Sequence, residues 1–178
     1  MKENIQIKDK TFQLFITENE INASLDNVAA KMTDDLQDKD PVFVAILNGS
    51  FMFASELMKR IRFKSQITFA KIQSYSGLQT TQVHKELIGF SENITGKTVV
   101  VVEDIVDSGL TMQYILNSLL TKEPAAIKIA TLLLKPDALQ YDLKPDYVAF
   151  SIPNSFVVGY GLDYDGYGRN LPNIYTLA

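Results

Sequence analysis

Three almost continuous apolar runs stand out in the hydrophobic pattern of this chain. They span Val42 to Leu47, Thr98 to Val102 and Ile127 to Leu134. Runs without polar alternation are typical of strands that are covered on both faces. We therefore expect these segments, together with a strand from Gln66 to Ile72, to form the centre of a sheet.

Helical patterns separate the predicted strands. Thr17 and Glu20 have the spacing of a capping box that opens a helix. The apolar residues that follow recur at helical spacing and predict one buried face: Ile21, Leu25, Val28, Ala29, Met32 and Leu36. Further helices are expected from Ser50 to Ile61 and from Gly109 to Leu120. Strands that alternate with helices imply right-handed crossovers, so we predict an α/β fold with a parallel sheet.

Other parts of the chain have a different pattern. Gln6 to Ile16 is strand-like, and short strand-like pieces recur at Tyr147 to Ser151 and at Phe156 to Val158. A stretch rich in Gly, Tyr and Asp then leads to Arg169, and we expect this tail to fold over one end of the sheet. Ser74 to Gln82 is rich in Gly, Gln and Thr, which predicts a polar loop.

Composition narrows the classes of function. The 178 residues are 46% hydrophobic and 21% charged, as in one ordinary globular domain. A net charge of -4 disfavours a protein that coats nucleic-acid phosphates. The lack of Cys excludes disulfides, thiolate zinc sites and a cysteine nucleophile. No apolar run approaches the roughly 18 residues that span a bilayer, and Met1 to Lys10 has no signal-peptide pattern, so we expect a cytoplasmic protein without nucleic-acid or membrane partners.

The strand that begins at Thr98 runs into a group of polar residues. The string VVVVEDIVDSGLT, residues 99–111, leads from a buried strand through carboxylates to a helix start. Parallel α/β sheets place ligands at this end of their strands, and free N–H groups at a helix start bind phosphate. A Walker loop is excluded because its Lys and glycine spacing are missing. The residues alone leave two interpretations open: a phosphate site, or a capped helix preceded by solvated carboxylates at Glu103 and Asp104.

The whole string resembles the signature with which type I phosphoribosyltransferases bind phosphoribosyl pyrophosphate (PRPP). The similarity covers most of the chain, which looks like the hypoxanthine-guanine branch of that family. It implies a central parallel sheet flanked by helices in a single domain, with a core of about 17–150 and a hood formed by 1–16 and 151–178. By this resemblance Glu103 and Asp104 bind the ribose hydroxyls. The implied 5'-phosphate loop consists of Asp107, Ser108, Gly109, Leu110 and Thr111, with Leu110 where many relatives carry Lys.

Two further stretches resemble loops of the same family. Asn48 and Gly49 match the pyrophosphate loop, in which a cis peptide bond joins Leu47 to Asn48. Several relatives carry Lys at the position of Asn48, so the basic side chain is missing here. Ser74 and Tyr75 match the start of the loop that closes over the active site. An ordinary strand-to-helix turn and a surface loop without a role are the alternative interpretations.

The base site is implied by two more matches. By resemblance, Lys135 donates to O6 of a 6-oxopurine, Phe156 stacks on the base, and the Val157 backbone reads its edge. Asp163 binds magnesium, while backbone carbonyls near it meet the purine, and Arg169 contacts pyrophosphate. The alternatives are a lysine that reaches solvent, a core phenylalanine and an aspartate in a turn.

Together the matches imply an enzyme of purine salvage. It transfers the 5-phosphoribosyl group from PRPP to N9 of hypoxanthine or guanine, giving IMP or GMP and pyrophosphate. Mg²⁺ is the implied cofactor, with Glu103, Asp104 and Asp163 as candidate ligands, and Asp107 is the candidate catalytic base. A homodimer or homotetramer with its contact near the Asn48 loop is also implied. Two alternatives stay open: a PRPP-sensing regulatory protein on the same fold, and a phosphoribosyltransferase for another base such as xanthine.

Overall fold

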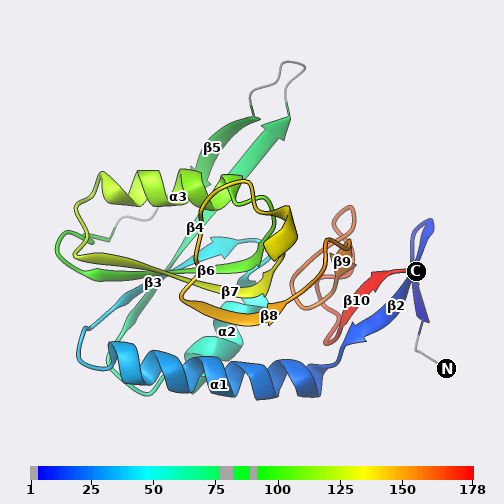
Figure 1. Ribbon diagram of the computed structural model, residues 1–178, viewed down its shortest axis with the longest axis horizontal. Helices are drawn as coiled ribbons and strands as arrows, with labels where there is room; N and C mark the ends of the chain where they lie inside the picture. Colours follow the sequence, from blue (N-terminus) through cyan, green and yellow to red (C-terminus); the bar gives the residue numbers. More distant parts are fainter. Residues whose placement is uncertain (1–3, 77–81, 89–91) are drawn as a thin grey trace.

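A six-stranded sheet with helices on both faces forms the larger part of the molecule (Figure 1). The computed structural model describes residues 4–76, 82–88 and 92–178. The strand order is β5-β4-β3-β6-β7-β8, with β3 (Val42–Leu47), β4 (Gln66–Ser76), β5 (Gln82–Ile88), β6 (Thr98–Val106), β7 (Ala126–Leu134) and β8 (Tyr147–Ser151). Strand β5 is antiparallel to β4, and the other pairs are parallel. The predicted α/β fold with a central parallel sheet is confirmed.

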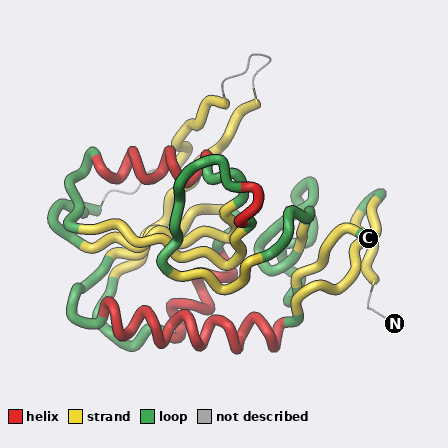
Figure 2. Tube along the Cα trace, viewed as in Figure 1, coloured by secondary structure: helices red, strands yellow, loops and turns green. Residues whose placement is uncertain are grey.

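The helices cover the two faces of this sheet unequally (Figures 1 and 2). Helices α1 (Glu18–Leu36) and α2 (Phe51–Arg60) pack on one face, and α3 (Leu110–Leu120) packs on the other. Alternate residues of each central strand point to opposite sides: Phe43 of β3 joins the α1 and α2 side, whereas Val44 joins the α3 side. Burial on both faces is why these strands are continuously apolar in sequence.

Helix α1 begins as its sequence predicts. The Thr17 hydroxyl accepts a hydrogen bond from the Glu20 N–H at 3.3 Å, and the Thr17 N–H donates to the Glu20 carboxylate at 2.8 Å. All six residues of the predicted apolar face are buried. The capping box and the buried face are both confirmed. Within the described residues no helix combines the length and apolarity needed to cross a membrane.

A second sheet lies beside the first. It has the order β1-β2-β10-β9, with β1 (Asn4–Ile7), β2 (Lys10–Ile16), β9 (Val157–Val158) and β10 (Ile174–Leu177). The strand-like segment from Gln6 to Ile16 is divided by a turn, with Lys8 at φ 51°, and forms parts of two antiparallel strands. The partner strand β10 was not predicted. We propose that the two sheets correspond to the core and the hood of a single domain.

The predicted loop from Ser74 to Gln82 needs correction. Strand β4 continues through Ser76, and the backbones of Ser74 and Tyr75 pair with β5, at His84 and Val83. This pairing satisfies the backbone of a polar segment that has no apolar pattern of its own. Residues 77–81 of the predicted loop lie outside the described ranges. The part of Ser74 and Tyr75 in a closing loop stays a prediction.

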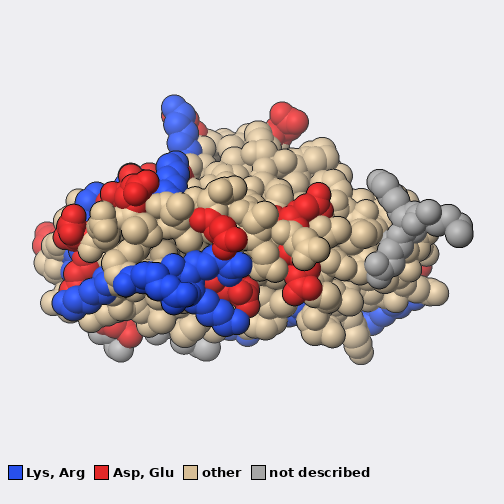
Figure 3. All heavy atoms as spheres, turned by 90° about the horizontal axis from the view of Figure 1, so that it is seen from below, with Lys and Arg blue, Asp and Glu red and all other residues tan. Residues whose placement is uncertain are grey.

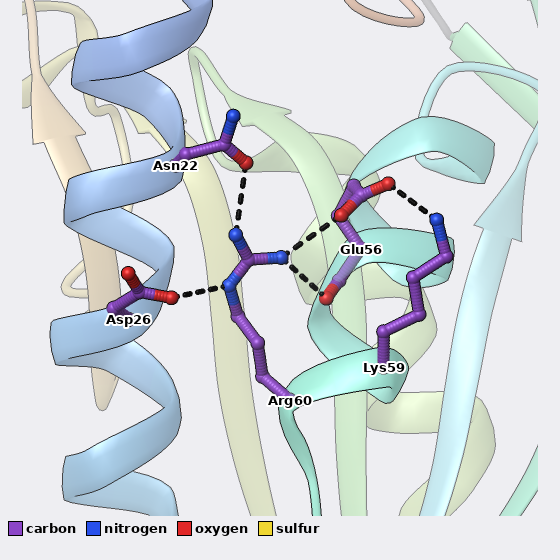
Figure 4. A network of polar contacts seen from close by, with 5 residues as sticks. All are labelled: Asn22, Asp26, Glu56, Lys59 and Arg60. Atoms are coloured by element: carbon purple, nitrogen blue, oxygen red, sulfur yellow. Dashed lines mark hydrogen bonds and ion pairs between the residues drawn. The ribbon is translucent and has the colours of Figure 1, made fainter.

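Charged side chains connect the two helices on one face of the sheet. Lys and Arg lie among Asp and Glu on this face (Figure 3). Arg60, at the end of α2, donates to Asp26 at 2.7 Å and to Asn22 at 2.8 Å, both on α1 (Figure 4). It also donates to the backbone oxygen and the carboxylate of Glu56, both at 2.9 Å. Arg60 therefore joins α1 to α2 through a side chain that is only 19% exposed.

We predict that Arg60→Met lowers the free energy of unfolding by about 1–2 kcal/mol, because several charge-assisted hydrogen bonds are lost together. The matched control is Lys59→Met, which removes an ion pair with Glu56 from a side chain that is 65% exposed. That change is expected to cost less than about 0.5 kcal/mol. Urea unfolding at pH 7 measures both. Equal losses in the two variants would contradict the role given to Arg60.

Candidate active site

The order of the parallel strands places a crevice at one end of the central sheet. From β3 the chain first adds β4 on one side and later adds β6, β7 and β8 on the other. Ligands bind beyond the carboxyl ends of strands where the winding direction changes in this way. Gly49 follows β3, and Glu103 and Asp104 lie toward the end of β6. These residues therefore meet at the change of direction.

A cavity of about 350 Å³ lies at this point. Its lining includes nine residues singled out from the sequence: Gly49, Glu103, Asp104, Asp107, Ser108, Gly109, Thr111, Asp163 and Arg169. Asn48 and Leu110 are not among the lining residues, and Asn48 is exposed. The apolar residues Ile46, Ile72 and Met112 also contribute to the wall. Their role could not be predicted, because these residues have the pattern of ordinary core positions.

A second cavity of about 240 Å³ adjoins the first. It contains the residues predicted to form a base site: Lys135, Phe156, Val157 and Asp163. Four lining residues are common to both cavities: Asp104, Ile105, Asp107 and Asp163. The segments that resemble phosphate and base sites, far apart in sequence, are therefore neighbours in space.

The loop from Asp107 to Thr111 joins β6 to α3. Gly109 has φ 84°, and a Cβ atom there would lie 2.5 Å from a methyl carbon of Leu143, so glycine fits best. Helix α3 begins at Leu110, whose N–H donates to the Ser108 hydroxyl at 3.4 Å, and the N–H groups that follow in the first turn have no partner within the helix. These donors, with the hydroxyls of Ser108 and Thr111, are suited to an anion whatever the side chain of Leu110.

Two glycines allow the segments around the first cavity to approach closely. A Cβ atom on Gly49 would lie 1.5 Å from a carboxylate oxygen of Asp104. Gly161, at φ 102°, lies against Gly49, since its Cβ atom would be 2.0 Å from the Gly49 carbonyl oxygen. The sequence indicated no role for Gly161. The peptide bond between Leu47 and Asn48 is cis, as the resemblance predicts.

Each cavity holds an ion pair between predicted site residues. Lys135, which is 7% exposed, places Nζ 2.5 Å from a carboxylate oxygen of Asp107. Arg169 places Nη2 2.5 Å from a carboxylate oxygen of Asp163 and donates through Nη1 to the Gly161 carbonyl at 2.7 Å. Both cations are thus paired with carboxylates inside the cavities.

Glu103 and Asp104 are adjacent carboxylates in a poorly solvated position. Burial raises the pKa of Glu103 well above its ordinary value, and the negative charge of Asp104 raises it further. Burial also raises the pKa of Asp104, against the lowering effect of hydrogen bonds and of Arg169. Ionising both groups therefore costs free energy in the ligand-free protein. A pair of this kind is more often found at functional sites than where it serves stability.

A pH-dependent stability follows from the raised pKa of Glu103. The folded state holds this proton more tightly than the unfolded chain does, so the contribution of Glu103 to stability is greatest below its unfolded pKa of about 4.3. It falls as the pH rises from there toward the raised folded pKa. We expect Glu103→Gln to increase the free energy of unfolding at pH 8 by about 1–3 kcal/mol and to flatten this fall.

Thermal unfolding between pH 4 and 8 tests the expectation. Asp38→Asn, at an exposed turn after α1, is the control and is expected to keep the wild-type profile. If Tm falls as steeply with pH in Glu103→Gln as in the wild type, another group carries the pH dependence.

Known proteins resemble this chain over nearly its whole length. The model of the phosphoribosyl transferase domain matches residues 16–165. Hypoxanthine phosphoribosyltransferase of Escherichia coli (strain K12) is 39% identical over 167 residues, which cover 92% of this chain and 94% of the relative. Hypoxanthine-guanine phosphoribosyltransferase of Streptococcus pyogenes is 37% identical over 166 residues, covering 93% and 92%.

Solved structures agree with these matches. The hypoxanthine-guanine phosphoribosyltransferase of Bacillus anthracis superposes with a TM-score of 0.86 at 38% identity, covering 97% of this chain and 98% of that one. The hypoxanthine phosphoribosyl transferase of Trypanosoma cruzi gives a TM-score of 0.88 at 33% identity, covering 98% and 95%.

Proposed function

The chain belongs to the phosphoribosyl transferase family, and from this premise we propose that it transfers the 5-phosphoribosyl group from PRPP to N9 of hypoxanthine, and also of guanine. The products are IMP or GMP and pyrophosphate. One observation carries the proposal: the cavity beside the phosphate loop and the cavity with the base residues share four lining residues. A sugar bound in the first cavity therefore presents its anomeric carbon to a base in the second.

PRPP occupies the first cavity in this proposal. The 5'-phosphate accepts hydrogen bonds from the backbone of residues 107–111 and from the Ser108 and Thr111 hydroxyls. Glu103 and Asp104 accept hydrogen bonds from the ribose hydroxyls. Their negative charge also stabilises the positive charge that develops on the sugar as pyrophosphate departs.

Pyrophosphate lies between the Gly49 loop and Arg169. The guanidinium of Arg169 suits phosphate oxygens because it donates two parallel hydrogen bonds. Asn48 is exposed and does not line the cavity, so this loop contributes backbone groups. No side chain of the loop takes the place of the lysine that several relatives carry at the position of Asn48.

In this proposal, carboxylates of the first cavity would hold magnesium together with the bound substrate. Among the described residues, no group of three or more His, Cys, Asp or Glu could hold a metal ion by itself. Mg²⁺ is usually bound by one or two carboxylates, with substrate phosphates and water as the other ligands. Asp163, Glu103 and Asp104 line the first cavity, so one or two of these carboxylates would hold the ion together with the substrate phosphates. When bound, Mg²⁺ neutralises charge on the departing pyrophosphate.

The base occupies the second cavity. Phe156 stacks on the purine, and the backbone of Val157 and the carbonyls near Asp163 read its edge. Lys135 donates to the exocyclic O6, which selects 6-oxopurines, because the amino group of adenine would face a donor there. Asp107 accepts the purine proton at N7 as N9 attacks the sugar. The ion pair between Lys135 and Asp107 opens when the base enters, and each partner then contacts one edge of the purine.

Initial rates with four bases test this function. Purified protein is given PRPP and Mg²⁺ with hypoxanthine, guanine, xanthine or adenine, and pyrophosphate release is followed. We expect turnover of hypoxanthine and guanine, with adenine slower by about 10⁴-fold or more. Turnover of xanthine alone would favour the alternative base. PRPP binding by calorimetry without turnover of any base would favour the regulatory protein.

The charge distribution on one face gives no support to the regulatory alternative. The basic run from Lys59 to Lys64 begins in the last turn of α2. On the face of α1 and α2, acidic side chains are interspersed among the basic ones (Figure 3). Three of its four cations form ion pairs, with Glu56, Asp26 and Asp40. Nucleic-acid binding needs a patch of excess positive charge.

A cytoplasmic location remains part of the proposal.

A homodimer or homotetramer is proposed to use an apolar groove formed by α2 and β4. Phe51, Ile67 and Phe69 are 43%, 37% and 43% exposed and line this groove together with Met58. Exposed apolar clusters of this kind are typical of subunit interfaces. Phe51 is two residues from Gly49, so the interface would hold the pyrophosphate loop in place.

We expect Phe69→Glu to weaken self-association by about 30-fold or more, because a buried aromatic contact is replaced by a charge. Light scattering over a concentration series measures the mass. Leu120→Glu, at a side chain 60% exposed on α3, is the control for an added charge on another surface. A wild-type mass for Phe69→Glu would exclude this groove as the interface.

A further inference from the structure

Phe156 belongs to a small group of aromatic rings in the hood. Its ring centroid lies 6.2 Å from that of Phe12 and 5.9 Å from that of Tyr164, which are 6.0 Å apart. Phe12 is fully buried, whereas Phe156 is 45% exposed. Phe156 lines the second cavity, but Phe12 and Tyr164 do not. The ring is therefore supported from outside the cavity and offers its remaining surface to the base.

The ammonium group of Lys10 contacts this aromatic group. Its Nζ lies 4.7 Å from the ring centroid of Tyr164 and 5.8 Å from that of Phe156. Both distances are within the range of cation–π attraction. Lys10 is absent from the lining of the second cavity, so its cation reaches Phe156 from outside.

The neighbours of Lys10 hold the same part of the chain. Lys8 forms an ion pair with Asp165 and lies 5.1 Å from the ring centroid of Tyr167. Asp9 accepts a hydrogen bond from the Tyr164 hydroxyl at 2.8 Å. The turn between β1 and β2, together with the first residue of β2, thus contacts the segment that follows Asp163 through three consecutive side chains. Lys10 is the one of the three that reaches the ring of Phe156.

We infer that Lys10 is a positioning residue of the base site, which increases the affinity for the purine through the ring of Phe156. The inference rests on the proposed function, because it takes Phe156 as the stacking platform. A cation near the ring restricts the orientation of a side chain that is otherwise half exposed, so less freedom is lost when the base binds. The cation also draws the π electrons toward itself, which makes the ring a better partner for the electron-rich face of a purine.

The test compares Lys10→Met with the wild type at saturating PRPP and Mg²⁺. Methionine keeps the length and the apolar stem but removes the charge. We expect the KM for hypoxanthine to rise about two- to fivefold, equal to about 0.4–1.0 kcal/mol, while kcat and the KM for PRPP stay unchanged. Lys10→Arg is expected to retain the wild-type KM, because it retains a cation.

Two control variants test whether the rise in the KM for hypoxanthine is specific to Lys10 or follows from the loss of any cation–π contact. Lys8→Met removes the neighbouring cation of the same turn, which contacts Tyr167 and not Phe156. Lys31→Met removes a cation 5.3 Å from the ring centroid of Tyr147, at a distant position on α1. Neither is expected to change the KM for hypoxanthine. In a Phe156→Leu background, Lys10→Met is expected to have no further effect, because the ring that transmits it is gone.

The outcomes distinguish the inference from the function on which it rests. Wild-type protein that forms no nucleotide would overturn both. Wild-type turnover with an unchanged KM in Lys10→Met would overturn the role of Lys10 alone. That role is also overturned if Lys8→Met raises the KM equally, or if the effect of Lys10→Met persists in the Phe156→Leu background.

Discussion

Replacing Asp107 with asparagine is expected to lower the rate of nucleotide formation by about 10²- to 10⁴-fold, the range typical for loss of a general base. Asparagine has nearly the same size and can still accept a hydrogen bond, but it cannot take the purine proton. The carboxylate lines both cavities, which is where a group must lie to reach a base and a sugar together. Single-turnover measurements are required, because slow product release would otherwise hide part of the loss.

Asp142→Asn is the control for this variant. Its side chain is 90% exposed and lies 3.9 Å from Lys144, and no part in the reaction is predicted for it. We expect the control to keep the wild-type rate. A single-turnover rate in Asp107→Asn within about threefold of the wild type would exclude Asp107 as the base, since general base catalysis contributes far more than that.

The second large effect is expected for Lys135→Met. Loss of a charged donor to O6 should reduce kcat/KM for hypoxanthine by about 100-fold, because the oxygen is then buried without a partner. Adenine has no O6, so its kcat/KM should not fall. The preference for hypoxanthine over adenine should therefore shrink by about the same factor of 100.

Lys144→Met provides the comparison, because the Lys144 side chain is 88% exposed. It is expected to leave the rates with both bases unchanged. A Lys135→Met variant in which both bases lose activity equally would show that Lys135 supports the fold or the Asp107 carboxylate without reading the base.

The sequence was most informative where burial alone determines the pattern. The bounds of the strand from Val42 to Leu47 were predicted correctly, because a strand covered on both faces has no polar position. The start of α1 was predicted from Thr17 and Glu20, because a capping box uses only local contacts. Both features depend little on the rest of the fold.

The features that the sequence did not predict are strands whose formation depends on pairing with distant segments, and one turn. Strand β10 (Ile174–Leu177) has four residues, and its place between β2 and β9 depends on contacts far away in sequence. Strand β5 is polar and lies at the sheet edge, so it has no apolar pattern to predict it. The turn at Lys8 adopts a positive φ without glycine, and no residue type there indicated it.

In the candidate site, too, features that depend on local sequence were predicted, whereas contacts between distant segments were not. The local motifs singled out residues 107–111 and Lys135 as candidates, and all of these except Leu110 line cavities that adjoin each other. Local sequence could not indicate that Gly161 packs against Gly49, because that contact joins segments more than a hundred residues apart. The contact between Lys10 and Phe156 also joins distant segments, so local sequence does not indicate it.

Product analysis of the wild-type protein is the most direct test of the proposed transfer. PRPP, Mg²⁺ and hypoxanthine are incubated with the enzyme, and the products are separated by chromatography and identified by mass. We predict one IMP and one pyrophosphate for each PRPP consumed, without ribose 5-phosphate. Consumption of PRPP to ribose 5-phosphate, or bound PRPP that yields no nucleotide with hypoxanthine or guanine, would contradict the proposed function.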